Sequence, residues 1–200
     1  MRKRVLSMLL VFCMILTWLP TSALAVDAAQ PYATPANTDA STIWDGSVAD
    51  SYAGGSGTSG DPYLIATAEQ LARVADQVNS GAESGKSYRL LNDIYLNDVS
   101  SVNIWDTVVP QNKWVPIGSA STLFSGVFDG AGYSVQGLYI STADNYQGLF
   151  GSVTSSGPIS NLSIEESYIN GGNYVGGICG YSSSSLSNCH NGATVIGAAM

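Results

Sequence analysis

Carboxylates are the side chains of this sequence that come nearest to a hydrolytic site. Hydrolysis of a glycosidic bond needs two carboxyl groups about 5–10 Å apart across a cleft. Glu165 and Glu166 are neighbours in an expected strand, where adjacent side chains point to opposite faces. Asp129 precedes Gly130 in an expected turn, where an Asp side chain commonly bonds the local backbone. Since residues 114–200 also contain no Lys or Arg to hold an acidic sugar, the sequence predicts no enzymatic activity within this chain.

Tyrosines are the other side chains that could hold a ligand. An exposed row of rings could stack on neutral sugars, because each ring has an apolar face and a polar hydroxyl. The alternative is that each ring packs at a corner of the fold with its hydroxyl in water, as in ordinary aromatic-rich strands. We favour packing and leave sugar binding open for Tyr133, Tyr139, Tyr146, Tyr168, Tyr174 and Tyr181.

Three further motifs resemble cofactor sites but lack required residues. The segment 81–87 resembles a phosphate-binding loop, but three residues separate its glycines where that loop has four, and it follows an expected helix. Gly54–Gly57 hints at a calcium-binding repeat, yet there is one copy, with Ser59 where an Asp is needed. His190 beside Cys189 offers too few ligands for a zinc site. The sequence therefore predicts no nucleotide, calcium or metal cofactor.

The elements that would position these side chains follow from an internal repeat. Gly148-Leu149-Phe150-Gly151 recurs as Gly177-Ile178-Cys179-Gly180, and Gly126-Val127-Phe128-Asp129 is an imperfect earlier copy. A second matched segment follows each copy, at Val135–Leu138, Ile159–Leu162 and Leu186–Cys189. The interval between copies falls within the roughly 20–50 residues that are typical of a solenoid made of stacked strand-turn-strand coils.

Stacked coils would close a continuous core and pair the backbone of each coil with the next. We expect Phe150, Leu162, Ile178 and Cys189 to point into that interior. Cys179 occupies the apolar position of Phe150, and a free Cys behaves as a small buried hydrophobe. Two packed thiols at Cys179 and Cys189 are therefore expected, with a disulfide as the alternative.

One amphipathic helix is expected over residues 67–79. Thr67 and Gln70 form a capping-box pattern at its start, and Asn79-Ser80-Gly81 ends it. Its apolar stripe is Ala68, Leu71, Ala75 and Val78, with Arg73, Asp76 and Gln77 away from the stripe. A helix in front of the repeats would cover the open edge and the core end of the first coil.

The N-terminal segment 1–25 has the pattern of a signal peptide. Arg2-Lys3-Arg4 precedes an apolar stretch, and Ala23-Leu24-Ala25 fits the small-x-small rule for cleavage after Ala25, which would leave no membrane span. Cleavage leaves four basic residues against fifteen acidic ones, a net charge of −11 that disfavours nucleic acid and anionic lipid as partners. We expect a flexible linker over 26–42, a cap module over 43–113 and the repeats over 114–200.

The order of these motifs resembles the GLUG-repeat proteins, which are large exported proteins of Gram-positive bacteria, many of them gut clostridia. The resemblance runs from about Trp44 to Met200. It is carried by Gly148-Leu149-Phe150-Gly151, by Val175-Gly176-Gly177-Ile178-Cys179-Gly180-Tyr181 and by the upstream segments 57–65, 88–94 and 114–118. The resemblance implies an all-β fold, a right-handed parallel β-helix on the cell surface.

We therefore expect a non-catalytic, secreted or cell-surface module that acts as a stalk, a spacer or an adhesion surface of a larger protein. GLUG repeats also flank the peptidase domain of some immunoglobulin A metalloproteases, but their His-Glu-x-x-His helix has no counterpart in a chain whose one histidine is His190. The alternative is a carbohydrate-binding or carbohydrate-active β-helix whose active part lies outside this chain. A glycan and a host protein are the candidate surface ligands. Val195-Ile196-Gly197 would begin another coil just before Met200, so we expect a fragment.

Overall fold

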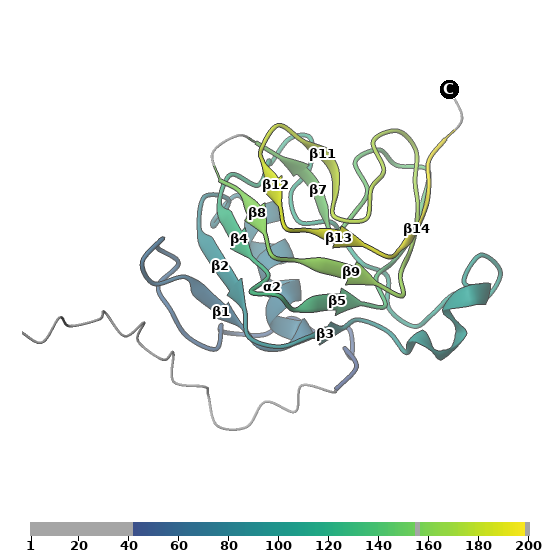
Figure 1. Cartoon of the computed structure of the whole chain (residues 1–200), viewed down its shortest axis with the longest axis horizontal. Helices are drawn as coiled ribbons and strands as arrows, with labels where there is room; N and C mark the ends of the chain where they lie inside the picture. Colours follow the sequence, from purple (N-terminus) through teal and green to yellow (C-terminus); the bar gives the residue numbers. More distant parts are fainter. Residues whose placement is uncertain (1–41, 155–156, 199–200) are drawn as a thin grey trace, which may run out of the picture. The chain divides into compact units, whose positions relative to one another are not determined.

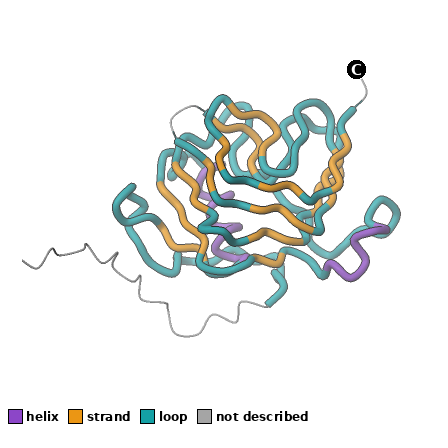
Figure 2. The backbone as a smooth tube through the Cα atoms, viewed as in Figure 1, coloured by secondary structure: helices purple, strands orange, loops and turns teal. Residues whose placement is uncertain are grey.

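The computed structural model describes residues 42–154 and 157–198 (Figure 1). The expected signal peptide with Ala23 and Ala25, and the expected linker up to residue 41, lie outside these residues. Within them, short strands alternate with turns and loops, together with one α-helix and one 3-10 helix (Figure 2). The fold is therefore mostly β, as the sequence predicts.

The elements follow one another in this order. The residues before the repeats form β1 (Tyr63–Ile65), α2 (Ala68–Asn79), β2 (Ser87–Leu90), β3 (Ile94–Tyr95) and the 3-10 helix η1 (Val99–Ile104). The repeats form β4 (Val127–Asp129), β5 (Ser134–Gln136), β6 (Tyr139–Ser141), β7 (Phe150–Val153), β8 (Ile159–Ser160), β9 (Ser163–Glu165), β10 (Tyr168–Asn170), β11 (Cys179–Ser182), β12 (Leu186–Ser187), β13 (His190–Asn191) and β14 (Thr194–Ile196).

These strands form four sheets, and all paired strands are parallel. One sheet has the order β1-β2-β4-β8-β12, and a second has the order β3-β5-β9-β13. The third is β6-β10-β14 and the fourth is β7-β11. The strands of residues 43–113 thus belong to the same sheets as strands of residues 114–200. Each sheet runs in one direction from early to late residues (Figure 1).

The register confirms the pairing of the two clear repeat copies. Phe150 in β7 lies opposite Cys179 in β11, the residue at the same position of the next copy. Ile159 in β8 lies opposite Leu186 in β12, which again begins the matched segment of the next copy. The apolar positions that match in the sequence are therefore stacked in space.

The alignment of the imperfect copy at residues 126–129 is wrong. Phe128 pairs with Ile159 and not with Phe150. The residue opposite Phe150 in the preceding pass of the chain is Ile117, which lies upstream of the matched motif rather than within it. Residues 126–129 resemble residues 148–151 in type but not in position. Ile117 lies beside β7, and the loop that follows it brings Phe128 into the sheet of β2 and β8.

Close contact between passes of the chain explains the glycines of the repeat. A Cβ on Gly148 would lie 2.6 Å from the carbonyl oxygen of Gly176, which is closer than real Cβ atoms approach. Gly151, Gly177 and Gly180 have neighbours at that distance or closer. A Cβ on Gly148 or Gly151 would collide with the backbone of a neighbouring pass, and a Cβ on Gly177 would collide with the Asn191 side chain, so the glycines have a structural role.

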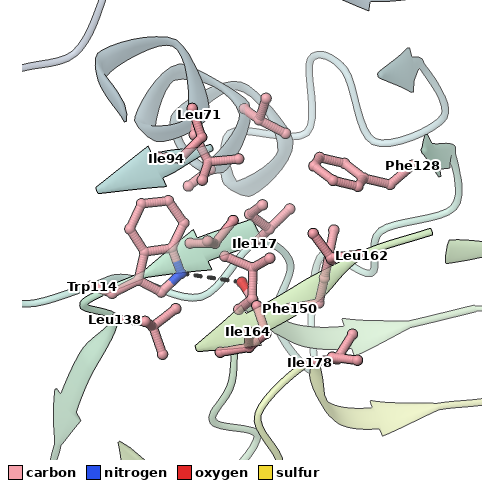
Figure 3. Close-up of a cluster of buried hydrophobic side chains, with 14 of the residues drawn as sticks. Leu71, Ile94, Trp114, Ile117, Phe128, Leu138, Phe150, Leu162, Ile164 and Ile178 are labelled. Carbon is pink, nitrogen blue, oxygen red and sulfur yellow. Dashed lines mark hydrogen bonds between the residues drawn. The ribbon is translucent and has the colours of Figure 1, made fainter. Parts of the chain in front are cut away.

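The interior side chains form one core that runs through the sheets (Figure 3). Phe150 and Leu162 are at most 1% exposed and Ile178 is 9% exposed, so these three predicted core positions are confirmed. Leu149 is fully buried beside them. Cys189 contacts the same core but is only half-buried, because β12 and β13 have no further strand beside them in the described part of the chain.

Helix α2 lies where the capping box predicts it. The Thr67 hydroxyl accepts a 3.4 Å hydrogen bond from the Gln70 N–H, and the Gln70 side chain accepts a 2.7 Å bond from the Ala66 N–H. The apolar face is wider than the expected stripe, because Ala72 and Val74 are buried as well. The helix therefore contributes a broad apolar surface to the main core.

The sequence did not predict the 3-10 helix η1 or the packing around it. Trp105 follows η1 and packs edge-on against Tyr139, with ring centroids 5.8 Å apart. Tyr139 in turn stacks on Tyr168, also at 5.8 Å. These buried rings form a second, smaller core beside β6 and β10, so Tyr139 and Tyr168 do not belong to an exposed row.

Other backbone segments cover the first strand of every sheet, and we call this side of the molecule the covered end. Each covering segment shares a backbone hydrogen bond of 2.9 Å with the strand beside it. The N–H groups of Ala53, Trp44 and Trp114 donate to carbonyls of β1, β3 and β6, and the Ile117 carbonyl accepts from the Gly151 N–H of β7. The Trp114 ring closes the core beside them, because its Nε1 donates a 3.1 Å bond to the Leu149 carbonyl (Figure 3).

Candidate functional site

Three of the predicted tyrosines meet at the surface, and we call Tyr146, Tyr174 and Tyr181 the tyrosine patch. Tyr146 and Tyr174 stack face to face, with centroids 4.8 Å apart and ring planes 6° from parallel. Tyr181 lies edge-on to both rings, at 6.4 and 6.0 Å. Tyr174 is 54% exposed and Tyr181 is 44% exposed, so the patch offers aromatic surface to solvent.

The backbone places the two stacked rings at equivalent positions. Tyr146 and Tyr174 have φ values of 63° and 60° in the segments that precede β7 and β11. The Gln147 N–H donates a 3.0 Å bond to the Tyr174 carbonyl and joins the two turns. Left-handed backbone costs a non-glycine residue roughly 1–2 kcal/mol, and an aromatic pair contributes about 0.5–1.5 kcal/mol. Stacking thus offsets part of the strain that the turns impose.

A hollow of about 410 Å³ adjoins the patch at Tyr146. Its polar lining comes from Asn79, Ser119, Ser121, Asn145 and Gln147, and no charged side chain lines it. Amides and hydroxyls beside an aromatic ring are groups that orient an uncharged polar ligand. The patch and the hollow together could therefore hold a neutral molecule that is rich in hydroxyl groups.

Asp129 has a local structural role, as the sequence predicts. Its Oδ1 accepts hydrogen bonds from the Ala131 N–H at 2.9 Å and from the Asn161 amide at 2.8 Å. Its Oδ2 lies 3.7 Å from Nε of Arg89. Asn161 also accepts a 2.9 Å bond from Asn188, which extends this side-chain ladder across three passes of the chain. The carboxylate thus helps to hold the turns in register.

Glu165 and Glu166 do not lie on one strand as expected. Strand β9 ends at Glu165, and Glu166 takes left-handed backbone with a φ of 43°. Glu165 Oε1 lies 3.8 Å from Nε2 of His190, which forms an ion pair when that histidine is protonated. Across the residues that the structure describes, no group of three His, Cys, Asp or Glu side chains could hold a metal ion.

A cluster of titratable side chains beside α2 was missed by the sequence analysis. Tyr52 donates a 2.5 Å hydrogen bond to Oε2 of Glu83, and Tyr88 donates a 3.3 Å bond to the same oxygen. Arg73 lies away from the apolar stripe of α2, and its guanidinium is 5.2 Å from the centroid of the Tyr52 ring. Glu83 belongs to residues 80–86, which connect α2 to β2, so the segment 81–87 forms a helix-to-strand connection that ends in the first residue of β2, as the sequence predicts.

Burial is the main cause that raises the pKa of both phenols in this cluster above the ordinary value of 10.0. The negative charge of Glu83 opposes a phenolate on Tyr52 or Tyr88 and raises each pKa further. Both phenols are therefore protonated at neutral pH and act as hydrogen-bond donors rather than bases. Because Tyr52 and Glu83 lie far apart in the sequence, on either side of α2, no local pattern could have revealed their contact.

Both described cysteines are free thiols, which agrees with the expectation of two packed side chains. Cys179 and Cys189 pack against the main core while remaining half-buried. Burial, with a smaller contribution from Cys189, raises the pKa of the Cys179 thiol to about 12. The nucleophilic form of cysteine is the thiolate, and the raised pKa disfavours this form of Cys179 at neutral pH.

The chain is similar to parts of longer proteins. It is 38% identical over 119 residues to a protein of Evansella cellulosilytica whose name describes a Gly-rich membrane protein, and the match covers 59% of this chain and 12% of that protein. It is 32% identical over 158 residues to halomucin of Haloquadratum walsbyi, and this match covers 76% of the chain and 2% of halomucin.

No family model matches the chain, and no solved structure matches it. Among the described residues, α2 is far too short to cross a bilayer, and no other helix has the length and apolar character for it. The chain is thus similar to short segments of two much longer proteins, of which it spans 12% and 2%.

Proposed function

We propose that this chain is a non-catalytic structural module of an extracellular surface protein, which acts as a stalk, a spacer or an adhesion surface. We further propose that it is a right-handed parallel β-helix of the GLUG-repeat type. One observation carries the proposal: four sheets of parallel strands stack pass after pass in a constant order. In such a stack each repeat contacts its neighbours, so the module is rigid and its length grows with the number of repeats.

The relatives and the charge support a role outside the cell. One relative is named as a Gly-rich membrane protein and the other as halomucin. This chain is similar to 12% and 2% of their lengths, as is typical of a module within a larger protein. Removal of residues 1–25 would leave a net charge of −11, which favours solubility of an exported protein. An acidic surface also repels polyanions and is suited to partners that are neutral or basic.

Export can be tested with an epitope-tagged chain in a Gram-positive host. We expect the product in the culture medium to begin at Val26, as measured by intact mass, because cleavage follows Ala25. Ala25→Asp should block cleavage and keep the product in the cell fraction. Uncleaved wild-type chain in the cytoplasm would contradict an extracellular role. Limited proteolysis of the secreted product should leave the stacked strands intact, and rapid cleavage within residues 63–153 would argue against a rigid module.

A second candidate function, the binding of neutral carbohydrate, is favoured by the tyrosine patch. Tyr174 and Tyr181 are exposed, and the adjoining hollow is lined by amide and hydroxyl groups. A sugar ring offers C–H groups to an aromatic face and hydroxyls to such polar groups. The sequence after Glu166 contains no charged residue apart from a protonated His190, which suits an uncharged ligand.

Carbohydrate binding can be tested on a glycan array, followed by titration with the neutral oligosaccharides that bind. Tyr174→Ala should weaken binding at least about tenfold, or about 1.4 kcal/mol, because it removes the more exposed ring of the stack. Tyr133→Ala is a matched control, because Tyr133 is 37% exposed and lies outside the patch. Absence of binding to neutral glycans, or an equal loss in both variants, would exclude the patch as a sugar site.

A further inference from the structure

Two loops of equal length carry the stacked rings of the tyrosine patch. Residues 142–149 connect β6 to β7 and contain Tyr146, and residues 171–178 connect β10 to β11 and contain Tyr174. The strands on both sides of these loops are paired in parallel, so the two loops lie against each other in successive passes of the chain. Tyr174 therefore covers one face of the Tyr146 ring, and the opposite face is directed toward the preceding pass.

The preceding pass has no loop at this position. Its Trp114 donates a backbone hydrogen bond to β6, and its Ile117 accepts one from β7. Val115 and Pro116 are the two residues between these bonds, where the next pass has residues 142–149 between the same two strands. This difference in length leaves open the hollow of about 410 Å³ beside the stacked rings. The hollow lies where a third ring of the stack would stand, and we call it the ring slot.

The ring slot has bonding groups that the fold does not fully use. Gln147 lines the slot and is only 7% exposed. Its Nε2 donates a 2.8 Å bond to the Asn145 carbonyl, whereas its Oε1 accepts no hydrogen bond from the residues that the structure describes. The Ser121 hydroxyl lies 3.1 Å from that of Ser119 and can form further bonds, because a hydroxyl has one donor and two acceptor positions. A ligand rich in hydroxyl groups matches this lining.

A second hollow, of about 540 Å³, adjoins the ring slot. Asn79 and Val115 line both hollows, so the two meet at the C-terminal end of α2. Val115 is 64% exposed at this junction and is accessible to a ligand that spans both hollows. The two hollows together form a groove with aromatic side chains at both ends. Beyond the junction, the groove is lined by Trp44, Ala75, Asp76, Lys113 and Trp114.

We propose that this groove binds a neutral oligosaccharide, with one pyranose ring in the ring slot against the outer face of Tyr146 and the next unit over Val115. The inference rests on the carbohydrate binding proposed above, and it moves the contact from the exposed rings of Tyr174 and Tyr181 to the opposite face of the stack. A pyranose presents C–H groups to the aromatic ring and hydroxyls to the amide and hydroxyl groups of the slot. An aromatic side chain of a protein partner would leave those polar groups unpaired, which costs free energy. Acidic sugars are disfavoured, because no cation lines the ring slot and the chain is acidic.

A variant that fills the ring slot tests the proposal by calorimetric titration with the neutral oligosaccharides that bind on a glycan array. Ala120 is exposed and lines the slot, so Ala120→Phe places a ring there and leaves the three patch tyrosines unchanged. We expect it to raise the dissociation constant at least about tenfold. Ala82→Phe is the matched control, because Ala82 is also exposed but lies in the connection from α2 to β2, and it should leave the dissociation constant unchanged. An oligosaccharide should bind at least about tenfold more tightly than the methyl glycoside of its own sugar unit.

NMR spectra of the bound sugar keep the test valid if Ala120→Phe disturbs folding. The C–H protons of the unit in the ring slot should shift upfield, because they face the Tyr146 ring. Tyr146→Asn removes that ring and introduces a residue type that tolerates the left-handed backbone at this position. The upfield shift should then disappear, and the dissociation constant should rise at least about tenfold.

The outcomes separate the ring slot from carbohydrate binding in general. If Tyr174→Ala weakens binding and Ala120→Phe does not, the sugar stacks on the exposed rings, so carbohydrate binding stands and the ring slot is wrong. If no neutral glycan binds, both proposals fail. Equal affinity for an oligosaccharide and its methyl glycoside overturns the groove. Binding of N-acetyltyrosinamide in place of neutral sugars overturns the choice of ligand, and so does tighter binding of acidic glycans.

Discussion

The covered end and the last described strand of each sheet, β11, β12, β13 and β14, which we call the terminal strands, lie on opposite sides of the same four sheets and differ in their cover. At the covered end each first strand is bonded by another backbone segment, and α2 and Trp114 seal the core. At the terminal strands the last backbone edges have no further strand in the described residues, and Leu186, Val195 and Ile196 are exposed. A side of the stack without a cover leaves backbone N–H and C=O groups unpaired and core side chains exposed to water.

At the covered end, segments without regular secondary structure supply the missing backbone partners. The segments that contain residues 53–54, Trp44, Trp114 and Ile117 are not strands, yet each supplies a bond that a further strand would supply. The exposed faces of the sheets need no such cover. There the side chains contact water while the backbone N–H and C=O groups remain paired between strands. Stability should therefore fall from the covered end towards the terminal strands, since a terminal repeat has one neighbour instead of two.

Hydrogen exchange at low protein concentration should show the largest difference between the two ends. Amides in α2 and β2 should open only with global unfolding, whose free energy is about 5–15 kcal/mol for ordinary domains. Amides in β12 and β14 should open by local fraying, at a free energy several kcal/mol lower. The expected contrast is thus several orders of magnitude in protection. Equal protection of Leu71 and Val195 in a monomer would show that the stack has no weak end.

A core substitution in the interior of the stack should have the next largest effect. Leu162 is 1% exposed and belongs to the main core, so Leu162→Ala leaves a cavity that neighbouring passes on both sides cannot fill. We expect the free energy of unfolding to fall by about 2–5 kcal/mol, as for other buried Leu truncations. Chemical denaturation measures this directly. A midpoint identical to that of the wild type would show that Leu162 does not point into the core.

Alkaline pH should weaken the covered end through its phenols. An unfolded Tyr titrates near pH 10.0, whereas burial and Glu83 raise the pKa of Tyr52 and Tyr88 in the folded chain. Their stabilisation is complete below pH 10 and is lost as the pH rises further, because the unfolded chain then releases protons that the folded chain retains. Denaturation at a series of pH values should show this loss, and Tyr52→Phe with Tyr88→Phe should reduce it.

The exposed Tyr133 offers a control for the alkaline experiment. Tyr133→Phe removes a phenol that is 37% exposed and lies outside the cluster, so its pH profile should follow that of the wild type. A double variant whose stability falls with pH as steeply as that of the wild type would show that the phenols beside Glu83 do not control the alkaline transition.

The sequence predicts those features that depend on neighbouring residues. The Thr67 and Gln70 capping box predicts α2, and the match of Phe150 with Cys179 predicts the register of β7 and β11. Both signals are local or repeat at a fixed interval. Two of the six candidate tyrosines, Tyr139 and Tyr168, are core residues instead, because the chain after η1 brings Trp105 over them.

The features that sequence analysis missed depend on loops of irregular length. Residue type aligns Phe128 with Phe150, but the strand of Phe128 belongs to another sheet, as its pairing with Ile159 shows. The contact between Tyr52 and Glu83 joins residues on either side of α2 and has no sequence signature. Within a regular repeat, the strand register follows from the repeat period. Across a loop of irregular length, it depends on tertiary packing that cannot be read from a single sequence.

The smallest effect is expected for a Leu at the terminal strands. Leu186 lies in register with the fully buried Ile159, yet it is 45% exposed because no strand of the described residues covers β12. Leu186→Ala removes side-chain atoms that are already in contact with water, so it loses part of the roughly 1.5–3 kcal/mol of a fully buried Leu and creates no closed cavity. We expect a loss below about 1 kcal/mol at concentrations where the chain is monomeric. If Leu186→Ala costs as much as Leu162→Ala under those conditions, the terminal strands are as well supported as the interior, and the difference between the two ends does not exist.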